Sequence, residues 1–272
     1  MRDAAMFLRL CHDAESVGVE SILVPIVTGL SDALELAAAM GQETTRVRFR
    51  VGCNFRGILA SLSGCELKKA WETLGTRLII HIIFDGDELT RNGGLLSVTE
   101  FIANCRKLFQ ESHTPQFDVE GTSSEAAFLA IKQADCLWRC PDRPNQVYAD
   151  ALPVLHFGRE VGLVSFVVAR ETRAEALEFA ATLLSGDCVE RLANPACWIT
   201  SDLWTGTLRG CEEERVLLLG SFEQVAHAIY GFKKSGISQF LIREGPCQKE
   251  MTYFGERVLP LIRAIESGRA GN

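Results

Sequence analysis

Short apolar runs alternate with amphipathic helical segments along most of this 272-residue chain, and this alternation limits the possible fold more than any other feature. Each run has the length and the bounding turn residues of a strand, and most are followed by apolar residues at helical spacing. Repeated strand–helix units favour a parallel sheet with right-handed crossovers. The predicted strands lie at 21–26, 46–53, 77–84, 116–119, 135–139, 162–169 and 238–242.

Seven or eight such units in one chain favour a (β/α)₈ TIM barrel over a doubly wound sheet. The chain has no linker rich in Gly, Pro or Ser, so we expect a single barrel domain over residues 1–272. Its N-terminal segment contains MFLRLCHDAESVG, whose apolar residues have helical spacing, and a first strand is therefore expected to be absent. Residues 186–215 are expected to be irregular.

Charge and composition exclude several classes of function. The formal net charge is −7 and no Lys/Arg stripe is present, which argues against nucleic-acid binding. No apolar run reaches the ~18–20 residues of a membrane span, and the N-terminal segment lacks the features of a signal peptide. The ten Cys are scattered without a CxxC pair, so no metal site is expected. We expect a cytoplasmic protein with reduced thiols.

Three Ser residues precede or open helical segments and are candidate caps. Ser31 is expected to be the N-cap of a helix over 31–40, and Ser97 with Glu100 forms a possible capping box. Ser123 is the third candidate, at the start of a helix over 123–133. Such helix starts collect unpaired N–H groups and the positive end of the helix dipole.

The stretch VEGTSSEAA, residues 119–127, is the best candidate for binding an anion. Gly121 would permit close backbone approach, and Thr122 and Ser123 offer hydroxyl and N–H donors where a helix begins. The alternative is a plain capped helix with Ser123 as the N-cap. The residues taken alone favour the cap, and both interpretations stay open at this point.

Six other residues could carry chemistry. Asp85 and Asp87 follow a buried strand and could act as general acid and base or hold Mg²⁺, although a solvated turn is the simpler interpretation. Trp138 and Cys140 could line a pocket or pack at its rim. His81 lies within an apolar strand and is interpreted as a hydrogen-bonded core residue. Trp204 is expected in a loop that could cover a ligand.

Taken together, these segments resemble the bacterial luciferase-like monooxygenases that depend on reduced flavin, and most of all their alkanesulfonate monooxygenase branch. The similarity runs from about residue 12 to about residue 264, and the order and spacing of its motifs are more specific than any one of them. The segments that carry it are AESVGVESILVP, RVRFRVG, RLIIHIIFDGD, FDVEGTSSEAAFLAIKQAD, VGLVSFVVARETRAEA, DLWTG, LLLGSFEQVAHAI, GISQFLI and FGERVLPLI.

The resemblance implies a TIM barrel that binds FMN as FMNH₂, which a separate flavin reductase supplies. The barrel would use O₂ to oxygenate a small organic substrate. The family's flavin phosphate sits at a Gly-Gly-Ser-Ser turn, which corresponds to Gly121, Thr122 and Ser123 here, with Glu120 in place of the first Gly. Members of the family commonly dimerise, so a homodimer or a heterodimer is implied.

The chain departs from the branch at positions that the branch uses in its active site. Val164 and Phe166 replace an Arg-x-His pair, and the chain is also shorter, lacking an insertion between Ser112 and Pro115. Two interpretations stay open: a different substrate in a more apolar pocket, or a flavin-binding or partner subunit with impaired catalysis. Three further replacements, of a Trp, an Arg and a Tyr, are Cys140, Cys211 and Gly245.

Overall fold

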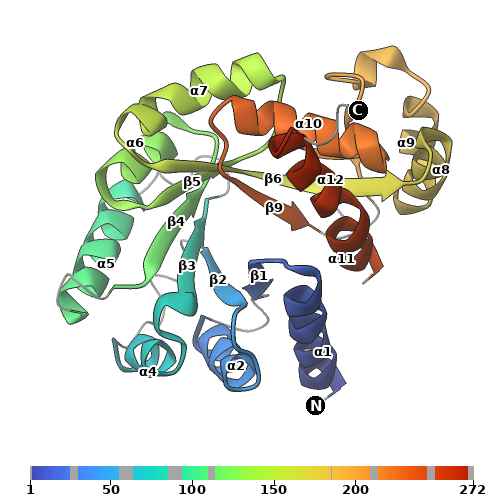
Figure 1. Cartoon of the computed structure of the whole chain (residues 1–272). Coiled ribbons are helices and arrows are strands. Elements are labelled where there is room, and N and C mark those ends of the chain that lie inside the picture. Colours follow the sequence, from blue (N-terminus) through green and yellow to red (C-terminus); the bar gives the residue numbers. More distant parts are fainter. Residues whose placement is uncertain are drawn as a thin grey trace. The chain divides into compact units, whose positions relative to one another are not determined.

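The computed structural model describes residues 2–24, 30–54, 64–84, 94–109, 114–184, 186–208, 214–243 and 249–268 (Figure 1). The chain forms two compact units. Unit 1 consists of Met1–Trp138 and His156–Glu160, and unit 2 consists of Arg139–Leu155 and Val161–Asn272. The single domain over residues 1–272 stays a prediction.

Unit 1 is built on parallel strands that neighbour one another in chain order. The strands are β1 (Ser21–Val24), β2 (Arg48–Asn54), β3 (Leu78–Ile83), β4 (Gln116–Glu120) and β5 (Cys136–Arg139). The helices are α1 (Arg2–Val17), α2 (Leu30–Gln42), α4 (Gly64–Leu74), α5 (Gly94–Leu108) and α6 (Ser124–Gln133), with a 3₁₀ turn at Gly75–Arg77.

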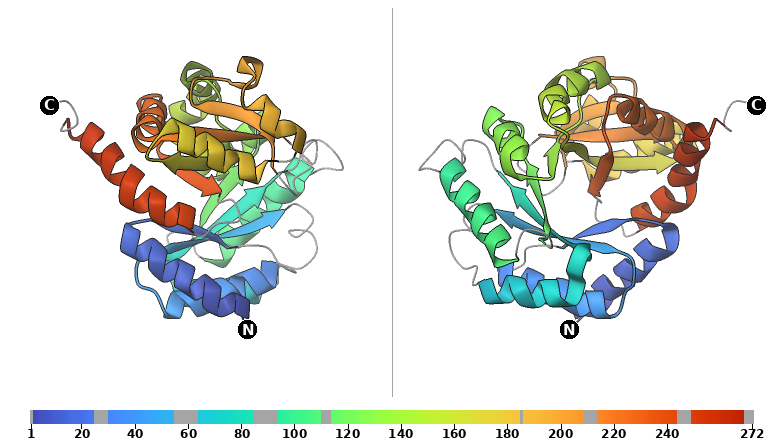
Figure 2. Two further views of the ribbon diagram at one scale, coloured as in Figure 1. Left: turned by 90° about the vertical axis from the view of Figure 1, so that its right-hand side faces the viewer. Right: turned by 60° about the vertical axis from the view of Figure 1, so that its left-hand side comes forward.

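The two faces of the unit 1 sheet differ in chemistry because side chains alternate along a strand. One face is apolar and packs against the helices, with Phe49, Val51 and Ile80 completely buried. In Figure 2, helices α1, α2 and α4, coloured blue to cyan, lie along one side of the blue to green strands. The other face is polar and carries His81 and Asp118, which pair directly in the register of β3 and β4.

Unit 2 is built around β6 (Glu160–Arg170), which pairs with β9 (Gln239–Arg243) along its first half and with β8 (Glu214–Ser221) along its second half. Both pairings are parallel, whereas β7 (Leu203–Thr207) runs antiparallel to β8. The helices and helical turns are α7 (Pro144–His156), α8 (Arg173–Leu183), α9 (Gly186–Arg191), a 3₁₀ turn (Pro195–Cys197), α10 (Phe222–Lys234), α11 (Lys249–Tyr253), a π turn (Phe254–Val258) and α12 (Leu259–Glu266).

Every predicted strand is present, and the described part of the chain starts with a helix, as expected. The expectation of irregular structure over 186–215 is wrong, because this region holds α9, β7 and the start of β8. These strands depend on pairing with each other and with β6, far away in the sequence, which local pattern does not reveal. Among the helices of the described ranges, none is long and apolar enough to cross a membrane.

The cap predictions had mixed outcomes. Ser123 is the N-cap of α6, and its side chain accepts a hydrogen bond from the N–H of Ala126 at 3.2 Å. The other two predictions are wrong, because α2 begins at Leu30 and α5 begins at Gly94, so that Ser31 and Ser97 lie within helices. Ser31 donates instead to Glu66 Oε1 of α4, at 2.8 Å, and joins the two helices.

Candidate functional site

A buried network of charged side chains lies on the polar face of the unit 1 sheet. Asp118, on β4, is completely buried and accepts hydrogen bonds from three side chains. Arg50 donates to its Oδ2 atom, Trp138 Nε1 donates to the same oxygen at 2.9 Å, and Gln116 Nε2 donates to Oδ1 at 2.9 Å. These donors compensate the carboxylate for the water that it has lost.

Arg50 is held in the same network by its stacking as well as by its charge. Its guanidinium carbon lies 4.4 Å from the centre of the Trp138 ring, and its Nε donates to Ser21 Oγ at 3.1 Å. Burial lowers the pKa of Arg50 to about 10, which still leaves it charged at neutral pH. Arg50 and Asp118 therefore form an ion pair that is buried on the polar face of the sheet.

His81 joins this network to the end of β4. Its ring is completely buried, and its Nε2 lies 2.9 Å from Glu120 Oε2. Its Nδ1 lies 3.9 Å from Asp118 Oδ2, and its ring meets Trp138 edge-on with the ring centres 5.9 Å apart. The interpretation of His81 as a hydrogen-bonded core residue is confirmed. The imidazole lies between two carboxylates, and the Glu120 side chain keeps 16% of its surface exposed.

The predicted anion-binding turn comes directly after Glu120. Gly121 donates its N–H to the carbonyl of Trp138 at 3.0 Å. A Cβ at this position would lie 2.9 Å from the Cβ of Ala126, so glycine allows the strand end and α6 to approach closely. Thr122 is exposed, and Ser123 caps the helix. The cap is confirmed, whereas phosphate binding at this turn stays a prediction.

The start of α6 stabilises negative charge. Glu125, in the first turn, has its pKa lowered by a hydrogen bond with its own backbone N–H and further by the Ser124 hydroxyl, which donates to Oε2 at 3.1 Å. The charged form of a carboxylate is stabilised here because the first N–H groups of a helix lack intrahelical partners and the N-terminal end of the helix dipole is positive. The same field would favour a phosphate.

In unit 2, two of the positions that the sequence resemblance assigns to an active site are apolar. Val164 is buried in β6, and Phe166 is half-buried and packs against a core cluster under α8. Cys140 is exposed. Four other candidates lie outside the described residues, namely Asp85, Asp87, Cys211 and Gly245.

Trp204 does not cover a ligand, and that prediction is wrong. It lies in β7, is completely buried in the core cluster of unit 2 and donates from Nε1 to the carbonyl of Arg191 at 3.2 Å. Trp138 is likewise almost completely buried. Both indoles serve as buried hydrogen-bond donors, the usual arrangement for Trp in a core.

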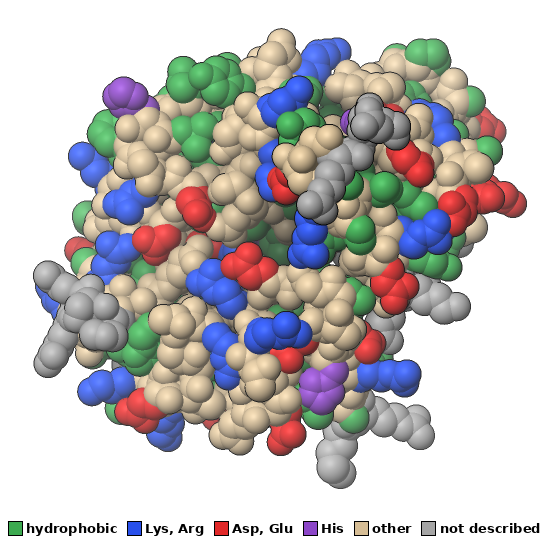
Figure 3. Space-filling model, in the orientation of Figure 1, with side chains coloured by type: hydrophobic (Ala, Val, Ile, Leu, Met, Phe, Trp, Pro, Cys, Tyr) green, Lys and Arg blue, Asp and Glu red, His purple; other side chains and the backbone are tan. Residues whose placement is uncertain are grey.

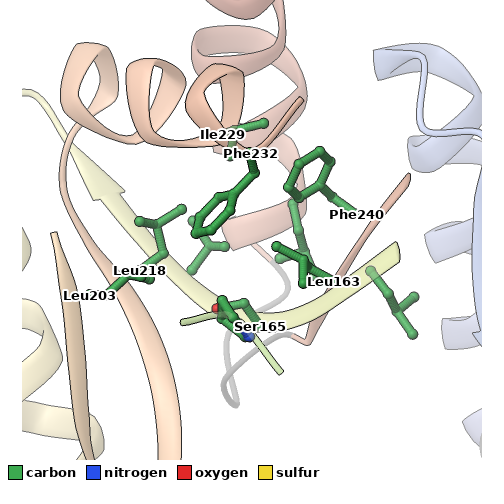
Figure 4. A pocket seen from close by; sticks show the side chains of 11 residues that line it. Leu163, Ser165, Leu203, Leu218, Ile229, Phe232 and Phe240 are labelled. Carbon is green, nitrogen blue, oxygen red and sulfur yellow. The ribbon is translucent and has the colours of Figure 1, made fainter. Parts of the chain in front are cut away.

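A small cavity in unit 2 lies between β6, β9 and α10. Figure 4 shows Leu163 and Ser165 of β6 facing Phe232 of α10 across it. Its volume of about 20 Å³ has room for roughly one water molecule, and a flavin does not fit. Within the part of the chain that the structure describes, no group of three or more His, Cys, Asp or Glu could hold a metal ion.

The sequence analysis did not predict the polar network, although the alternation of charged and apolar residues in two strands indicates it. Arg48 and Arg50 alternate with apolar residues in β2, and the polar residues of β4 do the same. A strand with charges at every second position and apolar residues between them has a polar face by geometry. Because β3 is otherwise continuously apolar, His81 marks the same face of the sheet there.

The molecular surface shown in Figure 3 differs from this sheet face, because basic and acidic side chains are interspersed on it.

Comparison with known proteins gives sequence relatives that are named as monooxygenases. No protein-family model matches the chain. It is 27% identical over 244 residues to the sulfoquinovose monooxygenase of Agrobacterium fabrum, covering 78% of this chain and 62% of the relative. It is 28% identical over 127 residues to the FMNH₂-dependent dimethylsulfone monooxygenase of Pseudomonas fluorescens, covering 41% of this chain and 35% of the relative. The chain thus spans less than two thirds of the length of each relative.

Among solved structures, the chain is similar to that of a long-chain alkane monooxygenase, with a TM-score of 0.70 and 15% identity. The similarity covers 98% of this chain and 85% of the other. The fold is therefore that of the luciferase-like (β/α)₈ TIM barrels. The chain is thus similar in sequence to two monooxygenases and in fold to a third. The alkanesulfonate branch is not singled out by these relatives.

Proposed function

We propose that this chain is a monooxygenase that uses FMNH₂ and O₂ to oxygenate a small organic substrate. The observation that carries the proposal is the turn of Gly121, Thr122 and Ser123, which joins a parallel strand to the start of a helix that stabilises negative charge. In the family that the sequence resembles, the corresponding turn binds the flavin phosphate. The relatives' names support a flavin cofactor.

The residues of the turn would hold the flavin phosphate in three ways. Gly121 brings the backbone of the strand end close to the helix, Thr122 presents an exposed hydroxyl, and the positive end of the α6 dipole would favour the anion. Reduced flavin would supply the electrons that activate O₂. The protein's part is to bind and orient the flavin and to exclude water from the reaction.

The proposal includes partners that this chain does not contain. A separate flavin reductase would deliver FMNH₂, and a homodimer or heterodimer is the expected assembly. The cell compartment would be the cytoplasm, where reductants for flavin are available. The chain would act as a single barrel domain, whose substrate class is set by apolar residues such as Val164 and Phe166.

A second candidate function is a flavin-binding or partner subunit with impaired catalysis. The observation that favours it is the apolar character of Val164 and Phe166, because neither side chain can exchange a proton or pair with an anionic substrate. The monooxygenase and a flavin-binding subunit would both bind flavin at the same turn. They differ in whether an oxygenated product forms when O₂ is admitted.

An anaerobic titration with FMNH₂, with later addition of O₂ and a screen of small organic substrates, separates the two. Saturable binding with oxygenated product supports the monooxygenase. Saturable binding without product from any substrate, with the flavin simply reoxidised, supports the subunit. Absence of flavin binding contradicts the monooxygenase and the flavin-binding subunit, and leaves the turn as a helix cap.

The phosphate site itself is tested by Thr122→Val. We expect FMN binding to weaken by about 1 kcal/mol or more, because a hydrogen bond to a charged group is lost. Thr73→Val is the matched control, since Thr73 lies in α4 of the same unit and its hydroxyl donates to the carbonyl of Lys69. Unchanged FMN affinity in Thr122→Val would show that the phosphate does not bind at this turn.

A further inference from the structure

We propose that His81 is a positioning residue for the anion-binding turn: it holds the Glu120 carboxylate on the polar face of the sheet, directed away from the turn at Gly121–Ser123. This inference rests on the proposed function, because it concerns the same phosphate site. It assigns a role to a buried residue that does not itself contact the flavin phosphate.

The geometry of two neighbouring strands carries the inference. Glu120 is the last residue of β4 and directly precedes Gly121. In the register of the sheet it pairs with Ile83, whereas its carboxylate bonds to His81, two residues further back on β3. The side chain therefore leans back along the sheet instead of forward over the start of α6.

The orientation of the carboxylate affects anion binding because a like charge repels phosphate. At ~6 Å and an effective dielectric constant of roughly 40, the repulsion between two unit charges corresponds to about a tenfold loss of affinity. A Glu at this position is compatible with an anion site when its charge is balanced and turned away. The hydrogen bond from His81 does both when the imidazole is protonated.

The groups that face His81 decide the net charge next to the turn. Asp118 of β4 faces it at 3.9 Å, and Arg50 of β2 neutralises Asp118. Trp138 of β5 meets the ring edge-on and carries no charge. The remaining pair, His81 with Glu120, is neutral when the imidazole is protonated and carries one negative charge when it is not. A protonated imidazole therefore favours phosphate binding at the turn.

FMN and riboflavin are the probes that isolate the phosphate, since riboflavin lacks it. The affinities of both oxidised flavins are measured by fluorescence quenching at about pH 6 and about pH 8, and their ratio reports the phosphate contribution. The titration of the FMN phosphate itself is common to all variants and cancels in the comparison. The proteins are the wild type, His81→Gln, Glu120→Gln, the double variant, and His12→Gln as an exposed-histidine control.

The expected result is about a tenfold fall in the FMN-to-riboflavin affinity ratio for His81→Gln at the lower pH, with riboflavin binding unchanged. In Glu120→Gln and in the double variant, the FMN-to-riboflavin affinity ratio equals or exceeds that of the wild type at both pH values. His12→Gln behaves as the wild type. This pattern shows that His81 acts through the Glu120 charge, which a merely structural role would not produce.

Three results would overturn the inference. If the wild type prefers FMN and His81→Gln keeps the full preference, the positioning role is wrong while the phosphate site stands. If the double variant loses as much as His81→Gln alone, the effect does not pass through Glu120. If the wild type binds FMN no better than riboflavin, the phosphate site and the inference fail together. Should His81→Gln not fold, Glu120→Gln decides alone, since weakened FMN binding in that variant contradicts the repulsion.

Discussion

Each unit of this protein contains a buried Arg–carboxylate pair, and the two pairs are built differently. In unit 1, Arg50 and Asp118 have side-chain exposures of 3% and 0% and lie within strands on one face of a sheet. In unit 2, Arg170 and Glu250 have exposures of 14% and 5% and join the end of β6 to the short helix α11. The first pair belongs to a polar sheet face, and the second fastens a helix to a strand end.

The surroundings of the two pairs explain the difference. Arg170 donates twice to Glu250, at 2.9 and 2.7 Å, and stacks on Phe179 with its guanidinium carbon 3.9 Å from the ring centre. Asp118, in contrast, is surrounded by further polar groups, including His81. Asp118 thus belongs to a polar network on its sheet face, whereas the unit 2 pair joins a helix to a strand end.

The largest effect is expected from breaking the unit 1 pair. Asp118→Leu leaves Arg50 charged and buried without its partner, and three side-chain donors lose their acceptor. We expect the free energy of unfolding to fall by about 3–5 kcal/mol, measured by urea denaturation at neutral pH. A loss below 1 kcal/mol would mean that water or another acceptor replaces the carboxylate.

A double variant sharpens this result. Arg50→Met combined with Asp118→Leu removes both charges and leaves apolar side chains of similar length. We expect it to recover about half or more of the lost stability, because the cost of the single variant lies mainly in the uncompensated charge. If the double variant is less stable than Asp118→Leu alone, the polar face is required for the fold as well as for function.

A smaller effect is expected from the unit 2 pair. Glu250→Gln keeps the shape of the side chain and one acceptor oxygen but removes the charge that Arg170 needs. Because Arg170 is partly exposed and still stacks on Phe179, we expect a loss of about 1.5–3 kcal/mol. The measurement is again urea denaturation, with the exposed Glu256→Gln as control. A loss equal to that of Asp118→Leu would remove the distinction between the two pairs.

The sequence predicted the strand–helix alternation because burial makes strands apolar and local caps mark helices. It could not predict β7 and β8, since a short apolar run such as LLLG takes its structure from the strand that it pairs with. Ser31 and Ser97 failed as caps because helices α2 and α5 begin earlier, at apolar or small residues. Helix boundaries are set by tertiary packing as much as by the capping residue.

For the candidate site, the turn and its cap were predictable because Gly and Ser have special backbone roles. The partner of Glu120 was not, because it lies on another strand, and only the register of β3 and β4 brings His81 within 2.9 Å. The charge of Glu120 is an objection to an anion at this turn. The structure shows where the carboxylate is held, which a sequence pattern does not contain.

A third carboxylate, Glu15 in α1, extends the comparison to a group near the surface. Its Oε1 accepts the backbone N–H groups of Thr45, Arg46 and Val47 at 2.9, 2.5 and 2.8 Å. Partial burial raises the pKa of Glu15, but these three bonds outweigh that effect and the net pKa is lowered. The carboxylate thus fastens α1 to the start of β2 without a buried cation.

Glu15→Gln is expected to have the smallest effect, about 1 kcal/mol at neutral pH, and the effect should depend on pH. A pKa lowered in the folded state contributes stability above the unfolded value of about 4.3, and this contribution is lost as the pH falls through the folded pKa. The gap between wild type and variant should therefore close in acid, when urea denaturation is measured from about pH 7 to about pH 3. Glu35→Gln, on the exposed side of α2, is the control. A gap that stays constant with pH would show that Glu15 acts through shape and not through its charge, unlike the carboxylates of the two buried pairs.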